Sequence, residues 1–327
     1  MNTPLVAPTT LRTEAGILAR LAWPIVLTQV SMMALGTVDM LLVGHVSKDA
    51  LAAVALGNIW KIGTVMLGMG LVLGIDPFVT QAHGARDGNA AARALQRGIV
   101  IALLATLPIA VLWCFTRDVL VLCGQNATLA AEAQRWVLVQ LPSLPAFLVF
   151  QALRQYLQGR GILKPMLWVA LAANVLNLGL DWVLIFGHCG APALGAFGSG
   201  IATCIVQCAM PLVLFAMIRA GRLHEGAWCP WSRAAFELRA LLSIVKVGAP
   251  ISAHFAAEIW GFQIAALAAG RLGTDELAAN TIVLNLVSMS FMLPLGFSLA
   301  TVTRVGNLIG SRKLREAQTA AWAAFAL

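Results

Sequence analysis

The sequence predicts an all-α polytopic membrane protein of parallel six-helix repeats, with about eight complete transmembrane helices and the start of a ninth. Hydrophobic residues make up 60% of the 327-residue chain, and only 11% of its residues are charged. A soluble domain carries about 25% charged residues, so this composition indicates a fold whose solvent is lipid. An internal repeat, described below, sets the number of helices in each unit.

Eight apolar windows are each long enough to cross about 30 Å of hydrocarbon, at about 1.5 Å of helical rise per residue. They cover residues 21–44, 51–75, 98–116, 136–156, 165–187, 194–218, 247–270 and 277–303, and a ninth begins near Ala317. The first window is too long for the apolar core of a signal peptide. We therefore expect it to remain in the protein as the first span.

Lysine and arginine are distributed unevenly over the two sides of the predicted membrane. With the N-terminus in the cytoplasm, seventeen of the 22 basic residues fall on the cytoplasmic side, Arg154 and Arg160 among them. Lys61 lies within the second span, and the outer loops hold only Lys48, Arg117, Arg135 and Arg271. Short cytoplasmic loops carry the positive excess. This pattern predicts a multi-pass membrane protein with a cytoplasmic N-terminus.

Several function classes are excluded by what the sequence contains. The net charge of +8 comes from short loops between apolar windows rather than from one basic face, so no nucleic acid partner is expected. HExxH and GxSxG motifs are absent, as is a selectivity-filter-like loop, so neither an enzyme nor a channel is predicted. The six cysteines show no close CxxC pair, which argues against a disulfide framework or metal site: Cys114, Cys123, Cys189, Cys204, Cys208 and Cys229.

Shifting the chain by 226 residues superposes its first part on its later part without a gap. Pro24 then falls on Pro250, and the run 51–53 falls on 277–279. Over residues 22–92, sixteen of seventy-one pairs are identical, where about six would match by chance. Six spans separate equivalent points, so both copies cross the membrane in the same direction. The repeat is therefore parallel, with a pseudo-two-fold axis along the membrane normal.

The repeat divides the chain into three parts. Residues 1–220 form an N-lobe of six transmembrane helices, 221–241 a polar cytoplasmic linker, and 242–327 a partial C-lobe. A complete second unit would end at roughly residue 446, so about four further helices are expected beyond this chain. Either a truncated gene or a fragment would account for the difference.

Four acidic residues fall within or at the ends of predicted spans, where a charge is costly and marks a cavity or a partner. They are Asp39, Asp76, Asp181 and Glu258. Asp39 and Asp181 both lie in the outer half of the N-lobe. Asn177 and Asn174 precede Asp181 by four and seven residues, which places three polar side chains on one helical face. A polar stripe in lipid requires an internal lumen.

The N-lobe acids favour an ion site. Two carboxylates and an amide oxygen are hard ligands suited to Na⁺, and a carboxyl group among apolar side chains can also carry a proton. The sequence predicts a Na⁺ or proton site at Asp39, Asn177 and Asp181, with no other cofactor. Alternatively, Asp39 and Asp181 only form hydrogen bonds between neighbouring helices.

The remaining polar groups lead to separate predictions. His254 lies one turn before Glu258, so both share a helical face and form a candidate cation or substrate site of the C-lobe; His254 alone is equally consistent with a hydrogen-bonded packing role. Asp76 precedes Pro77 near the cytoplasmic exit, where a cap or salt bridge is favoured. Lys61 is placed to pair with an acid.

Several stretches together resemble the multidrug and toxic compound extrusion (MATE) family, and its bacterial NorM-like branch in particular. They are AWPIVLTQ and VDMLLVGH in the first span, FQALRQYLQGRGILKP across spans four and five, NLGLDWVLIFG, GAFGSGIAT at the start of span six, and RVGNLIG after span eight. The resemblance runs from about residue 15 to 327, with the motifs in family order and at family spacing.

The resemblance implies a transporter of two six-helix lobes that alternates between outward- and inward-facing states. It exports lipophilic cationic drugs or toxic compounds in antiport with Na⁺ or H⁺, and acts as a monomer in the lipid bilayer. The resemblance assigns ion coupling to Asp39, Asn177, Asp181 and Thr203, and a C-lobe cation site to Glu258. The family's tenth-helix acid has no counterpart within the chain. One alternative is a lipid-linked precursor flippase of the same superfamily, but such a protein is expected to place basic residues in its cavity. The other alternative is a non-functional fragment.

Overall fold

The computed structural model describes residues 10–272 and 274–326, without the side chains of residues 263–282, 284–286 and 289. Every regular element in this part of the chain is helical. The elements are α1 (Leu11–Gly44), α2 (Lys48–Leu73), α3 (Asp76–Gly84), α4 (Gly88–Cys114), α5 (Thr116–Leu122), α6 (Ala127–Leu138), α7 (Ser143–Gly159), α8 (Lys164–Phe186), α9 (Ala196–Ala220), a 3-10 turn (Arg233–Phe236), α10 (Leu238–Leu272), α11 (Thr274–Gly310) and α12 (Leu314–Phe325).

The helices match the predicted fold class. Among the described residues, seven helical segments are long and apolar enough to cross a membrane, or eight if the bent pair α6–α7 is one span. These two helices meet at 54°. Pro142 lies at the break, where it disfavours helix at the preceding residue. The prediction of about eight spans is confirmed, and α12 lies where the ninth was expected to begin.

Polar residues fix where several helices start. The side chain at each of four N-caps accepts a hydrogen bond from a backbone N–H of the first turn, which satisfies a donor that the helix itself leaves open. These caps are Thr10 for α1, Ser47 for α2, Asp87 for α4 and Asn126 for α6. The loops between spans therefore carry the residues that restart each helix.

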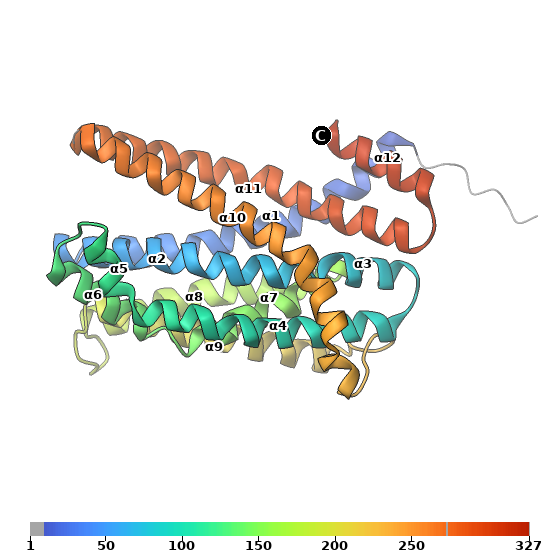
Figure 1. Ribbon diagram of the computed structural model, residues 1–327, viewed down its shortest axis with the longest axis horizontal. Coiled ribbons are helices and arrows are strands. Elements are labelled where there is room, and N and C mark those ends of the chain that lie inside the picture. Colours follow the sequence, from blue (N-terminus) through green and yellow to red (C-terminus); the bar gives the residue numbers. More distant parts are fainter. Residues whose placement is uncertain (1–9, 273, 327) are drawn as a thin grey trace, which may run out of the picture.

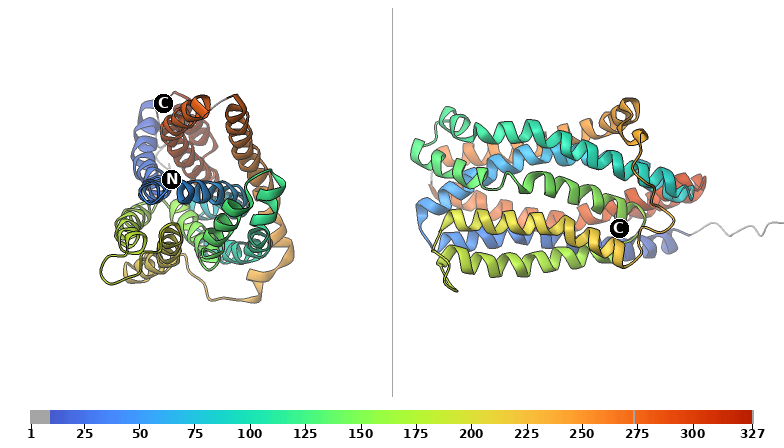
Figure 2. Two further views of the ribbon diagram at one scale, coloured as in Figure 1. Left: turned by 90° about the vertical axis from the view of Figure 1, so that its left-hand side faces the viewer. Right: turned by 90° about the horizontal axis from the view of Figure 1, so that it is seen from below.

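Helices α1–α9 form one bundle. α11, α12 and most of α10 lie along one side of it, while α10 begins beside α4 at the linker end (Figure 1). In this arrangement α10 crosses α2, while α11 packs along α1 and α3. The end-on view in Figure 2 shows the same division, with α10–α12 on one side. We call the segment 221–237 between α9 and α10 the linker. The predicted segment ran to residue 241, but 238–241 form the first turn of α10.

The α10–α12 group approaches the bundle closely at glycines. A Cβ at Gly74 would lie 2.6 Å from the carbonyl oxygen of Ile244 and 2.8 Å from the backbone nitrogen of Gly248. A Cβ at Gly84 would lie 2.0 Å from the carbonyl oxygen of Asn307. Small residues allow such backbone contacts between membrane helices. The two groups of helices are thus in direct backbone contact near the linker.

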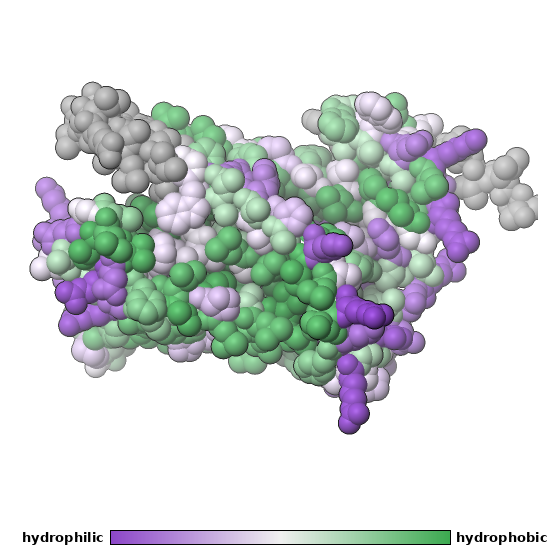
Figure 3. Space-filling view, in the orientation of Figure 1, coloured by the Kyte–Doolittle hydropathy of each residue, from purple (hydrophilic) through white to green (hydrophobic). Residues whose placement is uncertain are grey.

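Hydrophilic side chains gather at the two ends of the long axis, and hydrophobic ones cover the surface between them (Figure 3). We call the end that carries the linker the linker end, and the opposite one the far end. Arg154 departs from this pattern. It was counted with the cytoplasmic arginines, but it lies inside α7 and is only 3% exposed, so its inclusion among topology-setting loop charges was wrong.

Candidate ion-binding site

Asp39 lies near the far end of α1 and is almost fully buried, with 4% exposure. Its Oδ2 accepts a hydrogen bond from the Thr203 hydroxyl of α9 at 2.6 Å. Thr203 is itself 1% exposed. The other carboxylate oxygen of Asp39 is buried without a hydrogen-bond partner in the described part of the chain. This acid therefore has one fixed donor and one open ligand position.

Asn177 and Asp181 lie one turn apart on α8, and both are fully buried. None of their four side-chain oxygen and nitrogen atoms has a hydrogen-bond partner among the described residues. Asp181 is close enough to Asp39 for the two carboxyl groups to interact electrostatically. Buried polar groups are nearly always satisfied, and a buried charge needs a counter-charge. The structure thus brings the four predicted N-lobe residues together as an open polar cluster, which we call the Asp39 cluster: Asp39, Asn177, Asp181 and Thr203.

Asn174 does not share this role, although the predicted stripe included it. Its amide nitrogen donates to the carbonyl and hydroxyl oxygens of Ser31, both at 2.8 Å, and to the carbonyl of Ala170 at 2.9 Å. These bonds join α8 to α1. Of the three stripe residues, Asn174 is therefore structural, while Asn177 and Asp181 remain open for a ligand.

Lys61 of α2 lies beside the cluster and interacts electrostatically with Asp39. Its ammonium donates to Gln140 Oε1 at 2.9 Å and lies 4.7 Å from the centre of the Trp136 ring. Trp136 in turn donates to Ser199, one turn before Thr203 on α9. Lys61 therefore lies near an acid, as predicted, but no described ion pair joins it to Asp39. Gln140 and Trp136 were missed because no local pattern links α6 to α2.

His254 and Glu258 form a separate pair on α10. Their closest side-chain nitrogen and oxygen are 4.0 Å apart, and the side chains are 75% and 31% exposed. At about 100° per residue, they lie roughly 80–120° around α10 from Gly248, which contacts α2. No described hydrogen bond or ion pair joins them to the Asp39 cluster. The candidate C-lobe residues thus lie together, but apart from the N-lobe ones.

Asp76 lies in the first turn of α3 and is 5% exposed. A salt bridge or cap was favoured for it, but it forms no ion pair with any described residue, and its Oδ1 has no hydrogen-bond partner there. A first-turn carboxylate is stabilised by the partial positive charge of the helix start. The predicted salt bridge is therefore wrong for the part of the chain that the structure describes.

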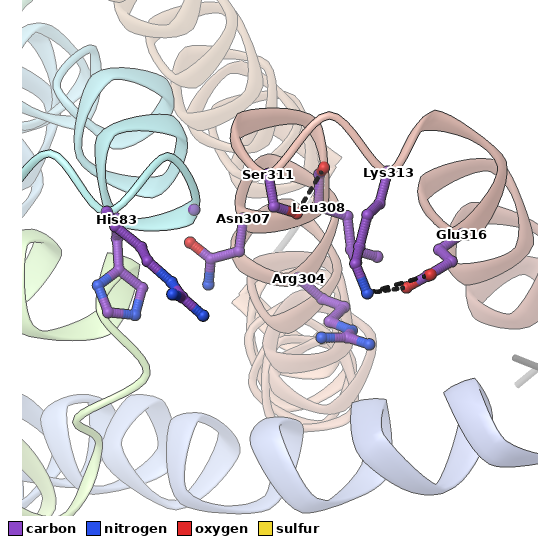
Figure 4. Close-up of a pocket in the computed structure, with 9 residues that line it drawn as sticks. His83, Arg304, Asn307, Leu308, Ser311, Lys313 and Glu316 are labelled. Atoms are coloured by element: carbon purple, nitrogen blue, oxygen red, sulfur yellow. Dashed lines mark hydrogen bonds and ion pairs between the residues drawn. The ribbon is translucent and has the colours of Figure 1, made fainter. Parts of the chain in front are cut away.

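A second polar region, not expected from the sequence, lies between α3, α11 and α12 at the linker end (Figure 4). A cavity of about 410 Å³ there is lined by His83, Arg304, Asn307, Lys313 and Glu316 among others. Lys313 forms an ion pair with Glu316 at 3.2 Å. Residues of this region come from helices about 220 positions apart in sequence, so no local motif predicts their meeting.

The Asp39 cluster offers two carboxylates, an amide and a hydroxyl in a protein interior. These are oxygen ligands for a hard monovalent cation, and either carboxyl can take a proton. Among the described residues, no three His, Cys, Asp or Glu side chains come together as a metal-binding group. A buried acidic site inside a bundle of membrane-spanning helices is characteristic of ion-coupled membrane transporters.

Comparison with known proteins identifies the family. The MatE family model matches residues 24–183 and 250–327. The chain therefore belongs to the MATE family, which confirms the resemblance and places it among transporters rather than enzymes.

Named relatives agree with this assignment. The chain is 32% identical over 308 residues to the multidrug resistance protein NorM of Vibrio vulnificus strain YJ016, covering 94% of this chain and 67% of that protein. It is 36% identical over 292 residues to a probable NorM of Bradyrhizobium diazoefficiens, covering 89% and 62%. Identity to multidrug and toxin extrusion protein 2 of Mus musculus is 32% over 308 residues, covering 94% and 53%. The chain thus spans between half and two thirds of these proteins.

Solved structures share the fold. The eukaryotic MATE transporter AtDTX14 superposes with a TM-score of 0.89 at 23% identity, over 97% of this chain and 70% of that one. A MOP superfamily transporter from Pyrococcus furiosus gives 0.82 at 20% identity, over 98% and 69%. That transporter is described as having a binding pocket of reversed polarity that suggests a different function.

Proposed function

We propose that this chain provides the ion-coupling part of a multidrug efflux transporter that exports lipophilic cationic compounds in antiport with Na⁺ or H⁺. The observation that carries the proposal is the Asp39 cluster, in which one carboxylate oxygen of Asp39 and both of Asp181 are buried without a hydrogen-bond partner among the described residues. A cation or proton there would offset the charge that two neighbouring carboxylates place in a low-dielectric interior.

Coupling requires the ion to bind two arrangements of the helix groups with different affinity. Asp39 belongs to α1, which also packs against α11. A change in the charge of Asp39 therefore acts on a helix that touches both groups. We propose that ion binding at the cluster shifts the relative stability of these arrangements and that His254 and Glu258 contribute to cation or substrate binding on α10.

The test uses the 327-residue chain in lipid vesicles with a fluorescent lipophilic cation and an imposed Na⁺ or proton gradient. We expect gradient-driven accumulation, reduced at least about tenfold in Asp39→Asn and Asp181→Asn because a transmembrane acid is needed to bind the ion. Asp118→Asn is the matched control, since Asp118 is exposed on α5. Accumulation that ignores the gradient, or survives Asp39→Asn, contradicts the proposal.

We propose a cytoplasmic linker end, as the basic residues indicate. Cys123 is exposed near the far end, while Cys229 lies in the linker. In single-cysteine variants, an impermeant maleimide added to intact cells is expected to label Cys123 and not Cys229. The reverse labelling contradicts this orientation.

The flippase alternative depends on basic residues in the cargo cavity. Lys61 lies near the cluster, and its ammonium is engaged with Gln140 and the Trp136 ring. The paired acids of α1 and α8 favour cationic cargo and ions. Gradient-dependent accumulation of the fluorescent cation separates the two functions, because a lipid flippase is not expected to concentrate it.

A further inference from the structure

A second cavity lies on the outer surface of the α1–α9 bundle. It has a volume of about 490 Å³ and is formed by α4, α7, α9 and the linker. Ile99 of α4, Val149 of α7 and Leu212 of α9 form its walls and floor, and Trp231 of the linker lies at one end. This volume is within the range of about 300–1,000 Å³ found for small-ligand pockets. We call it the α4–α9 groove.

The groove faces away from the α10–α12 group. Helices α10 and α11 pack mainly on α1, α2 and α3, and Figure 1 places α4 and α9 on the opposite side of the bundle. Leu103 and Leu212 at its rim are 48% and 70% exposed. In a membrane-spanning bundle, an apolar surface with such exposure lies against lipid. Lipid is therefore the molecule that reaches the groove without leaving the membrane.

One arginine, Arg219, lies at the linker end of the groove. The Arg219 guanidinium lies 5.8 Å from the ring centre of Phe215 and 5.4 Å from that of Trp228, and both aromatic residues line the groove. No acidic residue is among the described residues that line it. Glu237 of the linker is already paired with Arg97 at 3.6 Å, so a cationic drug at this end would meet the positive charge of Arg219. An anionic group is complementary to this end.

The linker holds the end of the groove in place. Gln96 of α4 donates its amide hydrogen to the carbonyl of Cys229 at 2.9 Å. Arg97 donates to the carbonyl of Ala234 at 3.1 Å, and Tyr156 donates to the carbonyl of Ala227. These bonds tie the linker backbone across α4 and α7. The linker residues at the end of the α4–α9 groove, beside the arginine, are thus held in place against α4 and α7.

We propose that the α4–α9 groove binds one acyl chain of an anionic phospholipid from the leaflet at the linker end, with the phosphate group near Arg219. The apolar walls take the chain, and the arginine selects the headgroup charge. Trp228 and Trp231 lie where tryptophan is favoured, at the boundary between hydrocarbon and headgroups. This site is independent of the proposed ion coupling.

Native mass spectrometry of the full chain tests occupancy, with phosphatidylglycerol and phosphatidylcholine supplied together. We expect one retained phosphatidylglycerol, which is lost in Ala146→Trp because the new side chain fills the groove. Ala172→Trp is the matched control, since Ala172 is exposed on α8 outside the groove. Equal retention of both lipids, or equal effects of both tryptophans, means annular lipid only and overturns the proposal.

The headgroup preference is tested through Cys229, which lines the groove. In a variant with the other five cysteines changed to serine, phosphatidylglycerol nanodiscs are expected to slow maleimide labelling of Cys229 relative to phosphatidylcholine. Arg219→Gln should weaken this protection about fivefold, the factor expected for one basic residue at an anionic surface. Arg222→Gln is the control, because Arg222 is 79% exposed and pairs with Glu225. Protection that does not depend on Arg219 overturns the headgroup assignment.

Discussion

Arg304 of α11 donates two hydrogen bonds to the carboxylate of Glu14 of α1, from Nε at 3.0 Å and from a terminal nitrogen at 2.8 Å. The Glu14 side chain is fully buried, whereas that of Arg304 is 23% exposed. A bidentate pair of this kind fixes both distance and orientation. It joins the two groups of helices at the linker end, beside the cavity of Figure 4.

Replacing either residue of this pair is expected to destabilise the protein, and replacing Arg304 should cost more than replacing Glu14. Arg304→Gln leaves a fully buried carboxylate without its bidentate partner, at a cost of about 3 kcal/mol. Glu14→Gln costs less, because Arg304 reaches solvent. Thermal unfolding in nanodiscs measures both, with exposed Arg12→Gln as control. The double variant should be less destabilised than the sum, and simple additivity contradicts a direct interaction.

Substitutions of Asn174 and Asn177 are expected to have different effects, the first on stability and the second on ion binding. Asn174→Ala removes three hydrogen bonds between or within helices, so unfolding free energy should fall by about 1–3 kcal/mol. Asn177→Ala removes no hydrogen bond to a described residue, so stability without ions should fall by less than in Asn174→Ala, while stabilisation by Na⁺ or by protons declines. Thermal unfolding across Na⁺ concentration and pH distinguishes these results. The same behaviour in both variants would contradict the assigned roles.

Lys61→Met should increase the response to Na⁺. The lysine places a positive charge near Asp39, and this charge opposes an incoming cation while it stabilises the empty site. Without it, the chain should be less stable in Na⁺-free buffer, and Na⁺ should bind about tenfold more tightly because one repulsive charge is gone. Calorimetric titration provides the dissociation constant, with exposed Lys48→Met as control. An unchanged constant would show that Lys61 is too distant to matter.

Thr203→Val removes the donor that holds Asp39 at 2.6 Å. Hydrogen bonds to charged groups contribute about 1.5–3 kcal/mol, so ion affinity at the cluster should change at least about tenfold as Asp39 loses its fixed orientation. Thr37→Val is the matched control in α1, because Thr37 is exposed and bonds only to a backbone carbonyl. Equal ion titrations for both variants would remove Thr203 from the site.

The apolar windows predicted the spans because lipid imposes one requirement on a whole stretch of chain, independent of partners. The acids were predicted for the same reason, since a carboxylate in lipid must have a function or a partner. Thr203 was predicted through the family resemblance alone, and its bond to Asp39 supplies the physical reason.

What the sequence did not predict depends on contacts between distant helices. Asn174 and Asn177 look equivalent along α8, and only the position of Ser31 on α1 separates them. Arg154 looked like a loop arginine because charge alone does not reveal burial within α7. Gln140 meets Lys61 from 79 residues away, at a bend whose angle no local pattern specifies.

Helix α11 runs unbroken for 37 residues, about 55 Å at the rise of an α-helix, whereas α2 and α3 divide the matching stretch near Gly74. The ion pair to Glu14 and the close contact at Gly84 both lie near one end of α11. The helix is therefore anchored to both α1 and α3 near that end. A rotation of about 10° about this anchor would move the opposite tip of a helix of this length by roughly 10 Å.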